Sequence, residues 1–271
     1  MLLNISYFEP IFKPLQGKKI GYIQNRDNIG GQIHQQGILQ LFKKFKIQYN
    51  IFKVPKKDVK WDECFFKNTD EFVISGGGIM GKCLQTPQIT LNIKNNYTLN
   101  IALHLRARIK ALKTGKKVTI LPQSFQGKED LPYYKVFVRE CISRQFYKGA
   151  ILAPDLGLGF DYDNDVQEPI LPQGIWLKTK TYEGIIYHKN NLGDPVDYCK
   201  TIKEYVDLAA KYKHIITDRC HFAIAGLLAN QNSNYQRKIT LVPNTYHKNW
   251  GLWLSWLHNL GVKWTNNIDE Y

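Results

Sequence analysis

Cysteine is scarce in this 271-residue sequence, and its few occurrences are far apart. There are five, an odd number, and no two of them form a Cys-x-x-Cys pair. This pattern indicates neither a disulfide framework nor a zinc site. The five cysteines are Cys64, Cys83, Cys141, Cys199 and Cys220.

Long hydrophobic runs, internal repeats and low-complexity tracts are also missing. No stretch reaches the ~20 apolar residues that a membrane span requires. The first residues do not combine a basic segment with a long apolar stretch, as a signal peptide does. We therefore expect a cytoplasmic, reducing location, with peripheral contact to a membrane left open.

Acidic residues are too few to balance the basic ones. Asp and Glu total 23 against 37 Lys and Arg, which gives a formal net charge of +14. Such an excess attracts anions, and nucleic acid, an anionic membrane and phosphorylated small molecules all qualify. The basic residues are scattered in short groups, however, not gathered in a tail or along one helix. We interpret most of them as solvated surface and expect no specific nucleic-acid partner.

Apolar surface is what the sequence has in quantity, since 44% of its residues are hydrophobic and can form a full core. A chain of this length suits one large α/β domain or two of modest size, and we favour two. Residues 18–24 form a short apolar segment typical of a buried strand, and the polar, Gly-containing segment 25–31 follows. From Gln32 onward, apolar residues recur at helical intervals. Strand, glycine loop and helix together open a βαβ unit.

The same alternation continues along the chain and predicts an α/β fold. In the first series we expect strands at 47–54, 71–75 and 118–121 and a helix at 97–112. The second series comprises a strand near 184, a helix at 194–213, a strand at 214–217, a helix at 221–229 and a strand at 239–242. Residues 157–180 are rich in Gly, Asp, Pro and Gln and are interpreted as the connection. The expected domains are residues 1–160 and a smaller unit of residues 161–271.

Small residues follow two of the first strands, at the end where parallel sheets bind ligands. Asn28 and Gly30 lie where the first strand gives way to a helix, and small residues there allow an anion to approach the backbone amides. Gly76, Gly77 and Gly78 follow the strand at 71–75 and offer unobstructed N–H groups to a phosphate or carboxylate. Each segment is also compatible with a turn that binds nothing.

Polar and basic residues follow the next strand. Gln123 and Ser124 end it, so that an amide and a hydroxyl reach the same edge of the sheet. Arg139, Ser143 and Arg144 come soon afterwards, and their two guanidinium groups offer the planar fork that grips a carboxylate or phosphate. These residues are candidates for substrate binding, although surface arginines are common.

The most informative segment contains Asp218, Arg219 and His221, where a strand ends and a helix begins. An anion and a proton donor both suit that position, because the start of a helix attracts negative charge. A salt bridge and a core histidine are the alternative interpretation.

Trp250 and its helical neighbours at 253 and 256 fit core packing better than a sugar-stacking platform. Three weaker candidates for orienting groups also follow strands, namely Asp155, Asn244 and His247.

Taken in order, these segments resemble the polysaccharide pyruvyl transferase family over roughly residues 20–250. The shared elements are an Asn-Ile-Gly loop, three glycines after a strand, a Gln-Ser strand end, Arg-Glu-x-x-Ser, Pro-Asp and Arg-x-His-x-Ala. Gly31 stands in place of the family's Asp, and Cys220 in place of its Leu. The resemblance implies two Rossmann-like domains similar to GT-B glycosyltransferases, the second one small. It implies phosphoenolpyruvate as donor, a carbohydrate acceptor, and neither a metal nor a nicotinamide cofactor.

On this resemblance, His221 is expected to act as general acid, and Arg219 and Arg139 to hold the donor's phosphate and carboxylate. The three glycines and Ser124 complete the expected donor site. Two other readings stay open: a GT-B-like glycosyltransferase that uses a nucleotide sugar, since fold does not fix function, and a non-catalytic protein that binds anionic glycans or nucleic acid.

Overall fold

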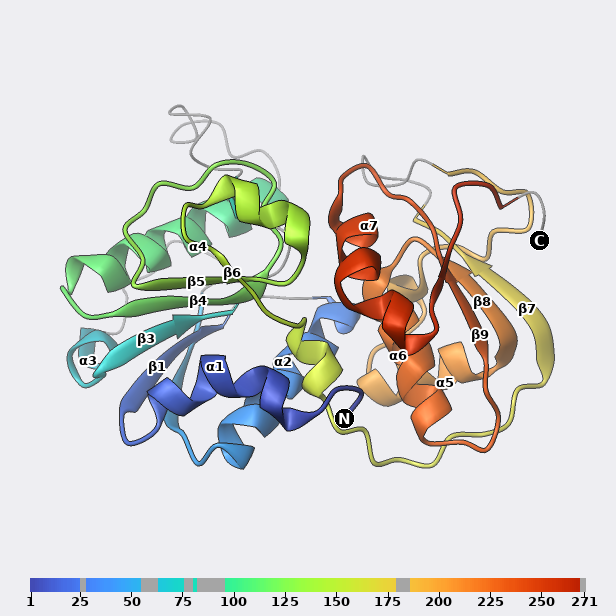
Figure 1. The fold of residues 1–271 in the computed structure, drawn as a ribbon, viewed down its shortest axis with the longest axis horizontal. Coiled ribbons are helices and arrows are strands. Elements are labelled where there is room, and N and C mark those ends of the chain that lie inside the picture. The colour runs from blue at the N-terminus through green and yellow to red at the C-terminus, as the bar shows by residue number, and fades with distance from the viewer. Residues whose placement is uncertain (25–27, 55–62, 76–79, 82–95, 179–185, 269–271) are drawn as a thin grey trace.

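The structure is a computed structural model that consists of two α/β halves lying side by side (Figure 1). It describes residues 1–24, 28–54, 63–75, 80–81, 96–178 and 186–268. Each half is built on its own parallel sheet, so the predicted fold class of two Rossmann-like domains, the second one smaller, is confirmed. The domain boundary between residues 160 and 161 stays a prediction.

The first sheet has six parallel strands in the order β2-β1-β3-β4-β5-β6. Strand order reverses between β1 and β3, and ligands of such sheets bind outside the carboxyl ends of the strands at that reversal. Asn28 and the glycines at 76–78 follow these two strands in the sequence. The strands are β1 (Lys19–Gln24), β2 (Gln48–Lys53), β3 (Glu71–Ile74), β4 (Val118–Gln123), β5 (Lys135–Val138) and β6 (Ile151–Leu152).

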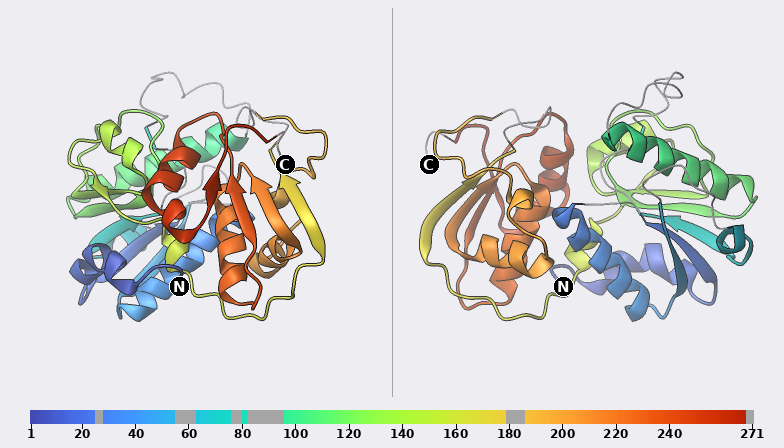
Figure 2. Two further views of the ribbon diagram at one scale, coloured as in Figure 1. Left: turned by 45° about the vertical axis from the view of Figure 1, so that its right-hand side comes forward. Right: turned by 180° about the vertical axis from the view of Figure 1, so that it is seen from behind.

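Helices cover both faces of this sheet, with α1 and α2 on one face and α4 on the other (Figures 1 and 2). The helix that positions the site is α2, and the Asn28 side chain caps it by accepting a hydrogen bond from the N–H of Gly31 at 3.0 Å. The helices of this half are α1 (Glu9–Phe12), α2 (Ile29–Lys44), α3 (Glu63–Lys67) and α4 (Asn96–Lys113).

The second sheet has four parallel strands in the order β10-β9-β8-β7. Its helix α6 is buried over almost its whole length, because it lies between this sheet and the first half. The elements are β7 (Leu171–Trp176), α5 (Ile202–Ala210), β8 (Tyr212–Thr217), α6 (Cys220–Gln231), β9 (Lys238–Leu241), α7 (Lys248–Leu252) and β10 (Lys263–Trp264). Short helical turns are η1 (Ile5–Phe8), η2 (Lys13–Leu15), η3 (Cys141–Phe146), η4 (Leu156–Gly159), η5 (Pro195–Asp197), η6 (Trp253–Leu257, a π-helix) and η7 (His258–Leu260).

The predicted start of the second sheet is wrong. Residues 186–188 are not in a strand, and residues 184 and 185 lie outside the described part. The strand is instead β7, inside the segment predicted as a connection. Pro172 and Gly174 concealed it, because both are rare within strands. Gly174 has a packing reason: a Cβ there would lie 2.7 Å from the Tyr212 ring on β8. The helix predicted at 194–213 is only η5 and α5, with β8 already under way at Tyr212.

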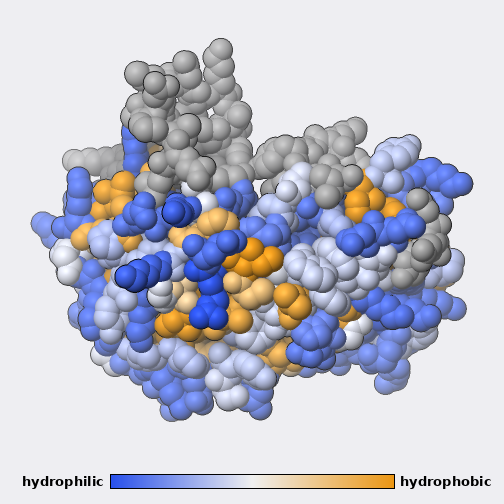
Figure 3. Space-filling view, turned by 45° about the horizontal axis from the view of Figure 1, so that its top comes forward, coloured by the Kyte–Doolittle hydropathy of each residue, from blue (hydrophilic) through white to orange (hydrophobic). Residues whose placement is uncertain are grey.

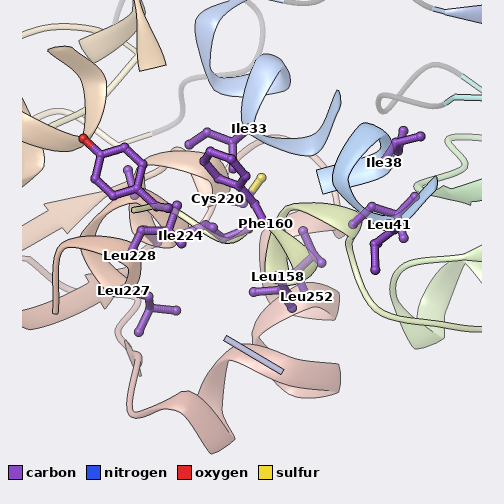
Figure 4. Close-up of a cluster of buried hydrophobic side chains, with 14 of the residues drawn as sticks. Ile33, Ile38, Leu41, Leu158, Phe160, Cys220, Ile224, Leu227, Leu228 and Leu252 are labelled. Carbon is purple, nitrogen blue, oxygen red and sulfur yellow. The ribbon is translucent and has the colours of Figure 1, made fainter. Parts of the chain in front are cut away.

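One of the buried hydrophobic clusters spans the two halves. Ile33 and Ile38 of α2 belong to the same buried cluster as Ile224 and Leu228 of α6, with Leu158 between the halves (Figure 4). Burial of a continuous apolar cluster fixes α2 against α6. This contact brings the start of α6 to the carboxyl edge of the first sheet.

The surface is mixed. Hydrophilic side chains are distributed over both halves in Figure 3, and hydrophobic groups are interspersed near the middle of that face. None of the helices in the described ranges combines the length and the apolar composition needed to cross a bilayer.

Candidate functional site

The candidate site is centred on the buried carboxylate of Asp155, just after β6. Arg139 Nη1 donates to Asp155 Oδ2 at 2.8 Å, and Arg139 Nε donates to the Ser124 hydroxyl at 2.9 Å. On the other side, His34 Nδ1 lies 3.0 Å from Asp155 Oδ1 and His221 Nε2 lies 3.4 Å from Oδ2. Residues just after β4, β5 and β6 and residues of α2 and α6 therefore converge on one carboxylate.

Electrostatics fix the charge of this centre. Burial alone would raise the pKa of Asp155, but His34, His221 and Arg139 together hold it well below its ordinary value. Burial opposes the charge of Arg139 as well, and Asp155 overcomes it, so the pKa of Arg139 is raised. An ionised carboxylate only accepts hydrogen bonds, so both histidines must donate to it from the nitrogen that faces it.

His221 is the member of this group that solvent can reach. Its side chain is 16% exposed, while those of Asp155, Arg139 and His34 are almost fully buried. Burial lowers the pKa of His221 below 6.5, and Asp155 only partly offsets this effect. Its Nε2 faces Asp155, and its Nδ1 has no hydrogen bond within the described part of the chain. The nitrogen left for a ligand is therefore Nδ1.

Gly30, in the first turn of α2, lies directly against this histidine. A Cβ on Gly30 would lie 3.2 Å from His221 Cβ and 3.2 Å from the Tyr205 hydroxyl oxygen. Arg219, two residues before His221, forms a two-pronged ion pair with Asp194, with Nε donating to Oδ1 at 3.0 Å and Nη2 donating to Oδ2. The start of α2 and the start of α6 thus meet at this point.

Asp218 precedes this arginine and is nearly fully buried. Burial raises its pKa to about 6, although Arg219 and the backbone N–H of Lys178, which donates to both carboxylate oxygens at 3.1 Å, oppose that shift. A carboxyl with a pKa near neutrality can exchange protons at physiological pH.

A second polar cluster links the two halves one residue beyond Arg139. Glu140 accepts hydrogen bonds from the backbone N–H of Ser143 at 2.9 Å and from the Ser143 hydroxyl. His247, in the loop after β9, places Nε2 3.4 Å from Glu140 Oε1. Trp256 Nε1 also donates to the carbonyl of Arg139 at 2.8 Å. The carboxyl end of β5 is therefore held by the second half.

The structure joins many of the predicted residues but not all of them. Gln123 is fully buried at the end of β4, and neither end of its amide has a partner among the described residues. Arg144 does not join Arg139, because it is exposed on η3. Asn244 is buried in the loop after β9. The predicted glycines Gly76, Gly77 and Gly78 lie outside the described residues.

Sequence reasoning missed His34, Glu140 as a contact of His247, and Asp194 as the partner of Arg219. The sequence carries a signal only for His34. This residue lies on the same face of α2 as Ile38 and Leu41, which are both buried. A histidine on an apolar helix face needs a polar partner.

Among the described residues, His34, Asp155 and His221 form a group whose ligand atoms lie within 4.8 Å of one another, as a metal site requires. Arg139 donates to the same carboxylate oxygen that His221 faces. The Arg139 guanidinium therefore already compensates the charge of Asp155. A divalent cation would need that negative charge for its own binding.

Comparisons with known proteins agree with this architecture. The family model described as polysaccharide pyruvyl transferase matches residues 28–233. A functionally uncharacterised protein from Klebsiella pneumoniae subsp. pneumoniae NTUH-K2044 is similar in structure, with a TM-score of 0.64 and 16% identity over 98% of this chain and 100% of that chain. A Mycobacterium smegmatis protein in complex with β-D-fucofuranose reaches a TM-score of only 0.30, with 9% identity over 83% and 74%. No curated protein matches the chain.

Proposed function

The chain belongs to the polysaccharide pyruvyl transferase family, and from this premise we propose that it transfers the enolpyruvyl group of phosphoenolpyruvate to two hydroxyls of a glycan. The product is a cyclic pyruvate ketal, and phosphate is released. A cytoplasmic location and peripheral membrane contact belong to the same proposal. The observation that carries it is the partly exposed His221, held by a buried carboxylate that Arg139 also holds.

The reaction needs one proton donor and groups that stabilise anions. Protonation of the methylene carbon makes the central carbon cationic, and a sugar hydroxyl adds to it and loses its proton. Phosphate then leaves, and the second hydroxyl adds to the same carbon and loses its proton. The two hydroxyls release two protons in total. One of these balances the proton that was added to the methylene carbon, and the other leaves with the phosphate.

We assign the proton donor to His221 Nδ1. Asp155 fixes the ring through Nε2, so a protonated ring directs its second N–H away from the carboxylate. In the free protein the lowered pKa keeps His221 neutral near pH 7. A phosphate or carboxylate nearby favours the imidazolium form, so binding of the donor itself raises the pKa of His221 and promotes its protonation.

Two of the remaining candidates, Arg219 and Gln123, hold the donor. Arg219 remains the expected phosphate ligand, with Asp194 fixing the plane of its guanidinium. Gln123 supplies an amide without a partner in the described structure, which suits the donor's carboxylate. Arg139 is buried and engaged, so its part is to hold Asp155 and Ser124 in position.

The first test is calorimetry of phosphoenolpyruvate binding in buffers of different ionisation enthalpy. Wild type is expected to take up a proton on binding, because the pKa of His221 rises in the complex. In His221→Gln the uptake should fall and phosphate release should drop at least ~100-fold, the typical contribution of a general acid. His258→Gln is the matched control, because this histidine is exposed and is not one of the candidate-site residues. Normal turnover by His221→Gln contradicts its assignment as the acid.

The second test separates donors by thermal melting. Phosphoenolpyruvate at 100 times its Kd should stabilise the protein by about 2.7 kcal/mol, and nucleotide sugars should not. Stabilisation by a nucleotide sugar alone indicates a glycosyltransferase instead. We also expect EDTA to leave phosphate release unchanged, because Arg139 already compensates the charge of Asp155.

A further inference from the structure

A cavity of about 400 Å³ lies at the carboxyl ends of β9 and β10, beside the Glu140 cluster. Its wall includes Tyr246, Trp250 and Trp264, with Asn244, His247 and Asn266 among its polar residues. We propose that this cavity binds a neutral pyranose ring of the carbohydrate acceptor. The proposal rests on the transferase function above and names the place where that substrate is held.

The aromatic wall is built to present a flat surface. Trp250 is 40% exposed, unusually open for so large an apolar side chain. Trp253 stacks on it with ring centres 5.0 Å apart, and Trp264 meets it edge-on at 5.1 Å. These contacts fix the indole while leaving part of it accessible. A pyranose presents a face of C–H groups that suits such a surface, and its hydroxyls remain free for polar groups.

The polar groups favour a ligand with neutral hydroxyls. None of the described residues that line the cavity is Lys, Arg, Asp or Glu, although the chain carries a formal charge of +14. Asn244 is only 9% exposed, and its carbonyl Oδ1 has no partner in the described structure. A buried acceptor without a partner is costly unless a ligand supplies the donor, and a sugar hydroxyl does so.

The cavity adjoins the donor site through two of its own residues. His247 Nε2 lies 3.4 Å from Glu140 Oε1, and Glu140 directly follows Arg139. Tyr246 packs edge-on against the His247 ring, with ring centres 5.6 Å apart. A sugar bound here is therefore next to the carboxyl end of β5, one residue from the arginine that holds Asp155.

Binding is tested first without the donor, on the full chain, by saturation-transfer NMR with the methyl β-glycosides of glucose, galactose, mannose and N-acetylglucosamine. At least one is expected to bind, and Trp250→Ala should weaken it about tenfold, the equivalent of one stacking contact. Trp250→Phe keeps an aromatic face and should restore most of the affinity. Leu254→Ala is the matched control, because Leu254 is 44% exposed on the adjoining π-helix and does not line the cavity.

Turnover with phosphoenolpyruvate then separates the two proposals. If both hold, Trp250→Ala raises the KM for the acceptor and leaves the KM for the donor unchanged. Glycoside binding that depends on Trp250 without any pyruvylated product supports the cavity and contradicts the transferase. Product formation with an unchanged acceptor KM in Trp250→Ala overturns the cavity and leaves the transferase standing. Absence of binding by all four glycosides, or equal binding by wild type and Trp250→Ala, also overturns the cavity.

Discussion

Asp155 is the counter-charge of the buried Arg139 guanidinium, and its replacement should be costly. Asp155→Asn keeps the shape but leaves the buried guanidinium of Arg139 without a counter-charge. Removal of one partner of a buried ion pair typically costs about 3–5 kcal/mol, so the free energy of unfolding in urea should fall by that amount. Asp161→Asn, at an ion pair whose carboxylate is 52% exposed, should change it by less than about 1 kcal/mol. Similar stabilities for the two variants would contradict this account.

His104 on α4 gives a pH dependence outside the site. Burial, with a smaller effect of Arg108, lowers its pKa from 6.5 to about 3. The unfolded chain therefore binds a proton that the folded chain excludes, so this stability is complete above pH 6.5 and is lost on acidification toward pH 3. Between pH 7 and pH 5 the loss should be about 2 kcal/mol. Urea unfolding at both values measures it.

The control for this prediction is His104→Leu, which cannot titrate. Its loss of stability between pH 7 and pH 5 should be smaller than that of wild type by about the same 2 kcal/mol. An identical pH slope in the two proteins would mean that the pKa of His104 is the same in the folded and the unfolded chain.

Single residues were predictable where a strand end placed them. Arg139, Asp155 and His221 meet because the carboxyl ends of parallel strands share an edge and because a helix starts there. His34 was missed, since its place on an apolar face of α2 indicates only that it needs a polar partner and does not say where that partner lies. The two-pronged bond of Arg219 to Asp194 spans 25 residues, and no local pattern announces it.

At the scale of elements, α2 depends on one close approach. A Cβ on Gly37 would lie 1.9 Å from the carbonyl oxygen of Leu156 in η4, next to Asp155. Gly→Ala within a helix normally stabilises by up to about 1 kcal/mol. Here overpacking reverses the sign, and Gly37→Ala should destabilise by about 1–3 kcal/mol, measured by urea unfolding. Gln36→Ala, on the exposed face of the same helix, should be nearly neutral. A stabilised Gly37→Ala variant would show that η4 can move away.

Elements with a clear period were predictable almost to the residue. The strands β1, β3 and β4 and the helix α4 lie within about two residues of their predicted bounds, because buried strands and amphipathic helices repeat at different intervals. The strand β7 was not predictable, since Pro172 and Gly174 resemble loop residues and only the Tyr212 ring on the neighbouring strand explains the glycine. Tertiary packing, which no local pattern records, decided that element.

For the whole molecule, the shared core between α2 and α6 predicts cooperative unfolding of both halves. Of the six tryptophans only Trp61 precedes residue 160, so tryptophan fluorescence reports mainly on the second half, whereas far-UV circular dichroism reports on both. The two signals should follow one transition in urea with the same midpoint, because α2 of the first half and α6 of the second pack into the same buried cluster. Separate midpoints would mean that the halves are independent units and that the core in Figure 4 contributes little to their association. In that case the geometry that brings His221 to Asp155 would rest on local contacts alone, and ligand-driven closure would have to assemble the site.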